Sequence, residues 1–120
     1  MKLEYSIYEM LQPFCLTGTR IGTTDLICAI RLVVEQPSRI HAVQKEVYMV
    51  MVIAEQRHCH WHAVESSIRR SLDEAWRHNR SYMQLLANRP LDQCPSASGF
   101  IFLCAGHLLR KQMTENTSQV

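Results

Sequence analysis

Polar side chains recur at helical spacing in the middle of the chain, and their chemistry suits contact with a nucleic acid. Glu65 precedes Arg69 by four residues, so on a helix its carboxylate can steady the guanidinium. An arginine held in this way can offer two donors to the edge of a guanine base. The same row also contains His62, Ser66, Asp73 and Arg77. An ordinary solvated helix face has this pattern too, so spacing alone leaves both interpretations open.

Directly before this row, histidines and a cysteine are concentrated in the segment HCHWH, residues 58–62. His58 and His62 are four residues apart and would project together on a helix, which raises a metal-site hypothesis. A structural zinc site normally needs four ligands, and only Cys94 and His107 are available elsewhere as remote candidates. We therefore predict no metal site.

Motifs of known catalytic sites are missing from the sequence. It contains no glycine-rich phosphate loop, no GxSxG and no HExxH, and a cysteine with histidine neighbours is not by itself a catalytic pair. We predict that the protein is not an enzyme, has no cofactor and takes no small-molecule substrate.

The segments that must position the polar row are predicted to form two helices joined by a tight turn. A helix-turn-helix needs a small residue where its helices touch and an apolar residue about ten positions later, and Ala54 and Val64 have this separation. An apolar stripe at helical period is predicted to pack inward beside them. Its other members are Ile53, Ile68, Leu72 and Trp76.

Length and composition predict one compact domain, and the apolar periodicity along the chain predicts that it is all-helical. The chain has 120 residues, 47% of them hydrophobic, and no Gly, Pro or Ser linker divides it. We expect a compact domain of about six helices over residues 1–113, followed by a frayed polar tail at 114–120. The net charge of +2 is weak for a nucleic-acid binder, so affinity would have to come from local clustering. That cluster comprises Arg57, Arg69, Arg70, Arg77, His78 and Arg80.

Apolar periodicity, caps and prolines set the expected helix boundaries. A first helix should end before Pro13, and a second should begin at Thr24 and Asp25 and end before Pro37. The YMVMVI segment could also form a strand, but no partner strand is visible and we predict a helix. The further helical segments are expected at residues 38–43, 45–56, 81–87 and from Ser96 to about residue 111.

This last segment is apolar on nearly every side, notably at Phe100, Phe102 and Leu103. Such a helix must be buried on more than one flank. It lies either at the centre of its own fold or in a contact with a second chain, and the sequence leaves both possibilities open.

The sequence also indicates a cellular location. Five cysteines without CxxC spacing fit a reducing cytoplasm, the first ten residues lack the apolar core of a signal peptide, and no apolar run reaches the ~20 residues needed to cross a bilayer. We expect a cytoplasmic protein without membrane association.

Three segments of the chain, VESSIRRSLDEAW, CPSASGFI and PFCLTG, resemble segments of one family. This family is the C-terminal DNA-binding effector domain of the stage-zero sporulation protein A of endospore-forming bacteria. The family's recognition helix, V-E-R-A-I-R-H-A-I-E-x-A-W, is matched by VESSIRRSLDEAW at residues 64–76. Its K-P-T-N-S-E-F-I segment is similar to CPSASGFI at 94–101, and its P-x-x-I-K-G to PFCLTG at 13–18. The three segments occur in the same order and span most of the chain.

The resemblance implies a bacterial, helical regulator that binds double-stranded DNA as a homodimer or tandem pair, with the helix around Val64 in the major groove. It implies base contacts from Glu65 and Arg69, to which Ser66 and His62 on the same flank are added. Phosphate contacts and dimer contacts are expected from two further groups. The first comprises Arg57, Trp61, Arg70, Arg77 and Arg80, and the second Phe100, Phe102 and Leu103.

Departures from the family pattern qualify these expectations. Ser66 stands where the family has a second arginine, so we expect a different target sequence. HCHWH replaces the family's Asn-Thr-Thr-x-Ser turn and removes hydroxyls suited to capping the helix. No receiver domain accompanies the segment, so a stand-alone regulator is expected. The alternative is a helical protein-interaction module that kept the fold but lost sequence-specific DNA binding.

Overall fold

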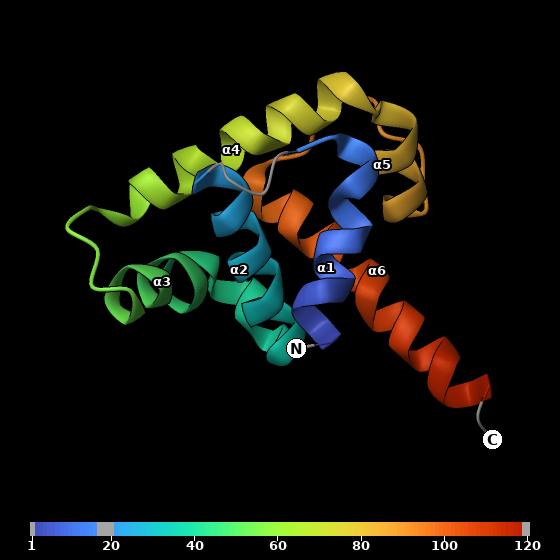
Figure 1. The fold of residues 1–120 in the computed structure, drawn as a ribbon, viewed down its shortest axis with the longest axis horizontal. Coiled ribbons are helices and arrows are strands. Elements are labelled where there is room, and N and C mark those ends of the chain that lie inside the picture. Colours follow the sequence, from blue (N-terminus) through green and yellow to red (C-terminus); the bar gives the residue numbers. More distant parts are fainter. Residues whose placement is uncertain (1, 17–20, 119–120) are drawn as a thin grey trace.

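The computed structural model describes residues 2–16 and 21–118, and every element among them is helical (Figure 1). The absence of strands from this part of the chain confirms the all-α fold class, and YMVMVI is helical as predicted. In chain order the elements are α1 (Lys2–Leu11), η1 (Gln12–Phe14), α2 (Ile21–Glu35), η2 (Pro37–Ala42), η3 (Gln44–Tyr48), α3 (Met49–Ala54), α4 (Trp61–His78), α5 (Arg80–Ala87) and α6 (Ala97–Ser118).

Helix α2 is the centre of the fold, packing against α1, α4 and α6 (Figure 1). Its Leu26, Ala29 and Ile30 are fully buried, because apolar residues recur on three sides of this helix. The predicted start at Thr24 and Asp25 is wrong, since α2 already begins at Ile21. Asp25 therefore lies in the second turn of the helix, where it is buried instead of capping the helix.

The segment before α4 bears out only part of the predicted inward stripe. Val47 and Met51 in this segment are buried, but Ala54, a member of the predicted stripe, is exposed, and Ile53 is 70% exposed. The prediction that Ile53 and Ala54 pack against the next helix is therefore wrong. The physical reason is that α3 ends at Ala54 and the chain turns away there, while α4 packs mainly on α2.

A Schellman motif makes this turn. The N–H of Gln56 donates to the carbonyl of Ile53, and the N–H of Arg57 donates to that of Val52. Gln56 has a φ of 52°, in the left-handed region that such a turn requires. The motif fixes the direction in which the chain leaves α3, and it places Arg57 directly after the turn.

Side chains at the junction of α4 and α5 hold the end of the first helical segment. The Asn79 amide accepts from the N–H of Tyr82 at 3.2 Å, capping α5, and donates to the carbonyl of Pro13 at 3.1 Å. The Tyr82 hydroxyl donates to the carbonyl of Met10 at 2.5 Å. Phe14 packs edge-on against the Tyr82 ring. The amino-terminal segment is thus joined to the end of α4.

Helix α6 starts where predicted, because the Ser96 hydroxyl accepts from the N–H of Gly99 at 3.1 Å. It ends at Ser118, well beyond the predicted end near residue 111, since residues 107–118 contain no glycine or proline to stop it. The helix thus continues through most of the segment expected to be a frayed tail, while residues 119 and 120 lie outside the described part. Within that part, none of the helices has both the length and the apolar character to cross a membrane.

Candidate nucleic-acid interface

Helix α4 begins with a histidine cap. The His60 Nδ1 accepts from the N–H of His62 at 3.3 Å, and the two rings stack with their Nδ1 atoms 2.7 Å apart. One of these nitrogens must therefore carry a hydrogen while the other accepts it. The cap that the family pattern supplies with a hydroxyl is made here by an imidazole, which the sequence analysis did not anticipate.

The inner face of α4 packs on α2 through both apolar and small side chains. Val64, Ile68 and Leu72 are buried, as predicted. Between them, Ser67 and Ser71 approach Gly22 of α2 so closely that a Cβ there would lie 2.5 Å from Ser71 Oγ and 2.6 Å from the Ser67 carbonyl oxygen. This close approach fixes which side of α4 is turned inward. This close contact between α2 and α4 was not predicted from the sequence, although Gly22, Ser67 and Ser71 are small residues at helical positions.

The outer face of α4 carries the predicted polar row. His62, Ser66, Arg69 and Arg77 are all exposed, along with the acidic Asp73. The predicted pair forms, with Glu65 Oε1 3.6 Å from Arg69 Nη2. Exposed pairs of this kind contribute only ~0.3 to 0.5 kcal/mol to stability, so the Arg69 guanidinium can exchange this partner for another.

Three of the arginines expected at phosphates also lie on or just after α4. Arg70 and Arg77 are exposed, and the exposed Arg80 places its guanidinium 4.3 Å from the centre of the Trp76 ring. A cation held over an aromatic face keeps its N–H groups free at the edges. The carboxy-terminal half of α4 and the start of α5 therefore present a basic surface.

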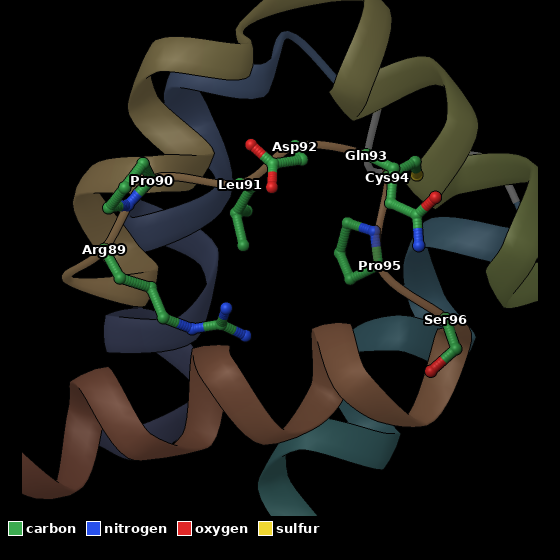
Figure 2. Close-up of a pocket in the computed structure, with 8 residues that line it drawn as sticks. All are labelled: Arg89, Pro90, Leu91, Asp92, Gln93, Cys94, Pro95 and Ser96. Atoms are coloured by element: carbon green, nitrogen blue, oxygen red, sulfur yellow. The ribbon is translucent and has the colours of Figure 1, made fainter.

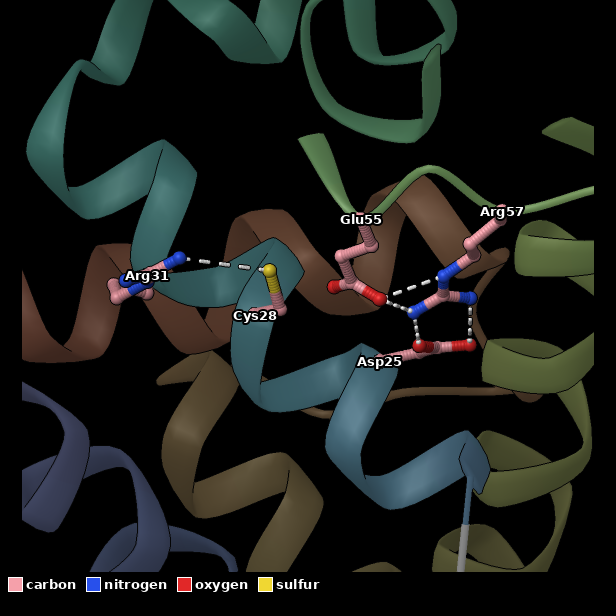
Figure 3. A network of polar contacts seen from close by, with 5 residues as sticks. All are labelled: Asp25, Cys28, Arg31, Glu55 and Arg57. Atoms are coloured by element: carbon pink, nitrogen blue, oxygen red, sulfur yellow. Dashed lines mark hydrogen bonds and ion pairs between the residues drawn. The ribbon is translucent and has the colours of Figure 1, made fainter. Parts of the chain in front are cut away.

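Arg57 is in a different environment. Its guanidinium donates to both carboxylate oxygens of Asp25 on α2 and to Glu55, as Figure 3 shows. Its side chain is 20% exposed, against 57% for Arg69. The structure thus places Arg57 in an internal ion pair, apart from the exposed arginines of α4. No pattern in the sequence predicts the ion pair between Arg57 and Asp25, because the two residues are 32 positions apart.

Trp61, the first residue of α4, stacks on Tyr48 with ring centroids 6.2 Å apart. Tyr48 is 2% exposed, and burial, together with the negative charge of Glu65, raises its pKa to about 12. Trp61 itself is half-buried. Its stacking on Tyr48 anchors the start of α4 to the helical turn before α3.

The fold buries two of the three residues expected at a dimer contact and leaves the third exposed. Phe100 is fully buried and Leu103 is 9% exposed, so both belong to the core that α6 shares with α2. Phe102 is 59% exposed. Central burial, one of the two possibilities for this helix, therefore accounts for Phe100 and Leu103, and among the three only Phe102 can reach another molecule.

The described residues include no group of three or more His, Cys, Asp or Glu side chains that could hold a metal ion. A pocket lies along the loop between α5 and α6, lined by residues 89–96 (Figure 2). Figure 2 shows the side chains of Arg89 and Asp92 pointing in different directions from this loop. Burial raises the pKa of the Cys94 thiol, which favours its unreactive form.

The geometry is therefore that of an amphipathic helix with a basic outer face, held on a helical core. The family model for the sporulation initiation factor Spo0A C terminal matches residues 7–108. The chain belongs to this family. Its members are non-enzymatic, DNA-binding transcription-regulator domains, and this is the function of the present domain. No curated protein and no solved structure matches the chain.

Proposed function

We propose that α4 is the recognition helix and enters the major groove of double-stranded DNA. The observation that carries this proposal is the division of α4 into a buried face and a continuous polar face. The helix has 18 residues, which at 1.5 Å per residue is about 27 Å, and its outer row runs from His62 to Arg77. A groove about 12 Å wide admits a helix with its side chains.

Base contacts come from the amino-terminal half of this row. Arg69 donates to the O6 and N7 of a guanine, and Glu65 orients the guanidinium or accepts from cytosine N4. Ser66 and His62 lie on the same flank and contact neighbouring bases. With a serine in place of a second arginine, one bidentate guanine contact is missing from the family's pattern, which changes the target sequence.

Phosphate contacts come from the exposed cations around this row. Arg70, Arg77 and Arg80 hold the protein in register without reading sequence, and the half-buried Trp61 contacts the DNA backbone at the start of α4. We leave Arg57 out of this group, because its guanidinium already binds the buried Asp25 carboxylate and Glu55. Since the net charge is only +2, this local cluster must supply the attraction to DNA.

Selection of duplexes from a random pool, followed by titration at several salt concentrations, tests the proposal. The wild-type protein should enrich a defined site and lose affinity steeply as salt rises. Arg69→Ala should weaken binding to that site by about 1 to 3 kcal/mol, whereas Arg89→Ala, which removes an exposed arginine in the α5–α6 loop, should have little effect. Equal affinities of the Arg69 variant and the wild type would contradict the proposal.

A second copy of the domain on the same DNA, as a homodimer or tandem pair, is part of this proposal. Phe102 supports it, because this exposed aromatic side chain has no place in the domain's own core. Analytical ultracentrifugation with and without a selected duplex carrying two sites should show whether two copies bind together, and whether Phe102→Ala separates them.

The exposed side of α6 also favours a second candidate function, that of a helical protein-interaction module. Phe102 and Met113 are 59% and 69% exposed, and eleven residues, or three turns, place them on the same side of the helix. A module of this kind would show little duplex binding at any salt concentration. Under this alternative, Phe102→Ala would disrupt association while Arg69→Ala would have no effect.

We place the domain in the bacterial cytoplasm. All five cysteines are free thiols, which suits a reducing compartment. Labelling of thiols in intact cells and in lysates, with a reagent that does not cross membranes, would test this placement, because cytoplasmic thiols should react only after lysis.

A further inference from the structure

The turn that leads into α4 is fastened to α2 by a guanidinium that bridges two carboxylates. Arg57 donates through Nη1 to Asp25 Oδ2 at 3.2 Å and through Nη2 to Asp25 Oδ1, and through Nε to Glu55 Oε2 at 2.7 Å. Figure 3 shows the two planar groups of Arg57 and Asp25 facing each other across the space between the turn and α2. A bidentate pair of this kind fixes orientation as well as distance.

Asp25 depends on this contact. Its side chain is 1% exposed, and a carboxylate removed from water requires a charged or hydrogen-bonding partner. Arg57 supplies hydrogen bonds to both of its oxygens. These bonds, opposed by burial and reinforced by Glu55, raise the pKa of the Arg57 guanidinium above its usual value. The contact with Asp25 therefore favours the charged form of Arg57.

The contact lies very close to the start of the recognition helix. His60, which caps α4, follows Arg57 by three residues, a span of at most about 11 Å of extended chain. On the other side, the Schellman motif at Gln56 fixes the direction in which the chain reaches Arg57. The first turn of α4 therefore cannot move far relative to α2 while Arg57 holds Asp25.

We propose that Asp25 and Arg57 form a positioning clamp that sets where the first turn of α4 meets DNA. Neither residue touches DNA in this role. The clamp acts through His62, Glu65 and Ser66, the base-facing residues of the first turns. The inference rests on the proposed function of α4 and assigns to Arg57 a role in specificity in place of the phosphate contact expected from the sequence.

Substitutions at both ends of the clamp, analysed as a double-mutant cycle, test the proposal. Asp25→Asn, Arg57→Gln and the double variant are compared with the wild type for binding to a duplex selected by the wild type and to a scrambled duplex of equal length. Salt dependence is measured for both duplexes. Circular dichroism gives the folded fraction of each variant at the assay temperature, and affinities refer to folded protein.

Each single variant should lose about tenfold or more in affinity for the selected duplex, the effect of losing one base contact. Affinity for the scrambled duplex and the salt slope should stay at wild-type values, because no phosphate contact is removed. The double variant should be no weaker than either single variant, since both changes release the same contact.

Arg31→Gln is the matched control. Arg31 lies on α2 and pairs with Glu4 of α1 at 3.4 Å, so this variant removes one cation and one ion pair without altering the turn before α4. It should bind both duplexes as the wild type does. Arg57→Lys covers the case in which Arg57→Gln does not fold, because lysine keeps the charge but cannot hold both oxygens of Asp25 in a fixed orientation. It should lose affinity for the selected duplex only.

Three results would overturn the clamp. If Arg57→Gln lowers the salt slope by about one while Asp25→Asn binds normally, Arg57 contacts a phosphate. If the folded fractions of all variants bind the selected duplex normally, the pair only stabilises the fold. If the wild type selects no duplex at all, the proposed function fails and the clamp with it, an outcome distinct from the first two.

Discussion

Arg57, in the turn before α4, and Arg69, on the outer face of α4, each pair with a glutamate but lie in opposite environments. Arg69 is 57% exposed, and its Nη2 lies 3.6 Å from Oε1 of Glu65 on the same helix face. Arg57 is 20% exposed and also meets Asp25, a buried carboxylate from another helix. An arginine paired on its own exposed helix face can exchange that partner for a ligand, whereas an arginine that also binds a buried carboxylate cannot leave without stranding a buried charge.

The largest effect is expected from removing the internal arginine. Arg57→Ala leaves the Asp25 carboxylate buried without its partner, which should lower the free energy of unfolding by about 3 to 5 kcal/mol. Arg69→Ala breaks an exposed pair and should change it by less than about 0.5 kcal/mol. Urea denaturation of both variants measures the difference. Similar values for the two would remove the distinction between these arginines.

A change at the contact between α2 and α4 should have the next largest effect, because this contact decides which face of α4 is turned outward. Gly22→Ala puts a methyl group against Ser71 and the backbone of Ser67, and should cost about 1 to 3 kcal/mol. Gly106→Ala is the control, since its added Cβ would meet only the flexible end of Arg110 at 3.3 Å. That variant should be neutral or up to about 1 kcal/mol more stable, and thermal unfolding would show both results.

A substitution at the exposed Arg70 tests whether the exposed arginines of α4 bind DNA. Arg70→Gln removes a cation that we assign to a phosphate, so binding should weaken to the same extent on selected and scrambled duplexes, and the salt slope should fall by about one. Arg57→Gln should leave that slope unchanged. Fluorescence anisotropy titrations at several salt concentrations give both slopes. A slope for Arg70→Gln equal to that of the wild type would place Arg70 away from the DNA.

The smallest effect is expected at Tyr48, beneath the start of α4. Its buried hydroxyl has no hydrogen-bond partner among the described residues, so Tyr48→Phe should change stability at neutral pH by less than about 1 kcal/mol.

The stabilities of Tyr48→Phe and the wild type should differ more clearly at alkaline pH. A tyrosine ionises near pH 10 when unfolded, while the folded pKa of Tyr48 is about 12. Its contribution to stability is therefore complete below pH 10 and is lost as pH rises toward 12. Phenylalanine cannot ionise, so the variant should lose less stability over this window. Parallel losses in urea titrations at pH 9 and pH 11.5 would show that Tyr48 ionises freely.

Local patterns in the sequence predicted the helices and the orientation of α4. Val64, Ile68 and Leu72 recur at helical spacing, and the Glu65–Arg69 pair follows from the same spacing, so both could be read without knowing the fold. The cap at Ser96 is equally local. These features depend on residues within four positions of one another, which is why they were predictable.

Features that depend on distant residues were not predictable in this way. Asp25 and Arg57 are 32 positions apart, and no periodic pattern connects them. Ile53 and Ala54 continue the apolar spacing of their helix, but its end at Ala54 and the turn at Gln56 leave them outside the core. For Phe102, local spacing could not show which side of α6 would face away from the core that buries Phe100 and Leu103.

The hydrogen bonds from Asn79 and Tyr82 to the carbonyls of Pro13 and Met10 have a mechanical consequence. Both polar atoms of the Asn79 amide are engaged, one inside α5 and one on the first segment. Any movement that lifts α1 from the domain must therefore break two hydrogen bonds at the basic end of α4 before α1 is released. While both bonds are intact, a displacement of α1 is passed on to the end of α4 that carries Arg77.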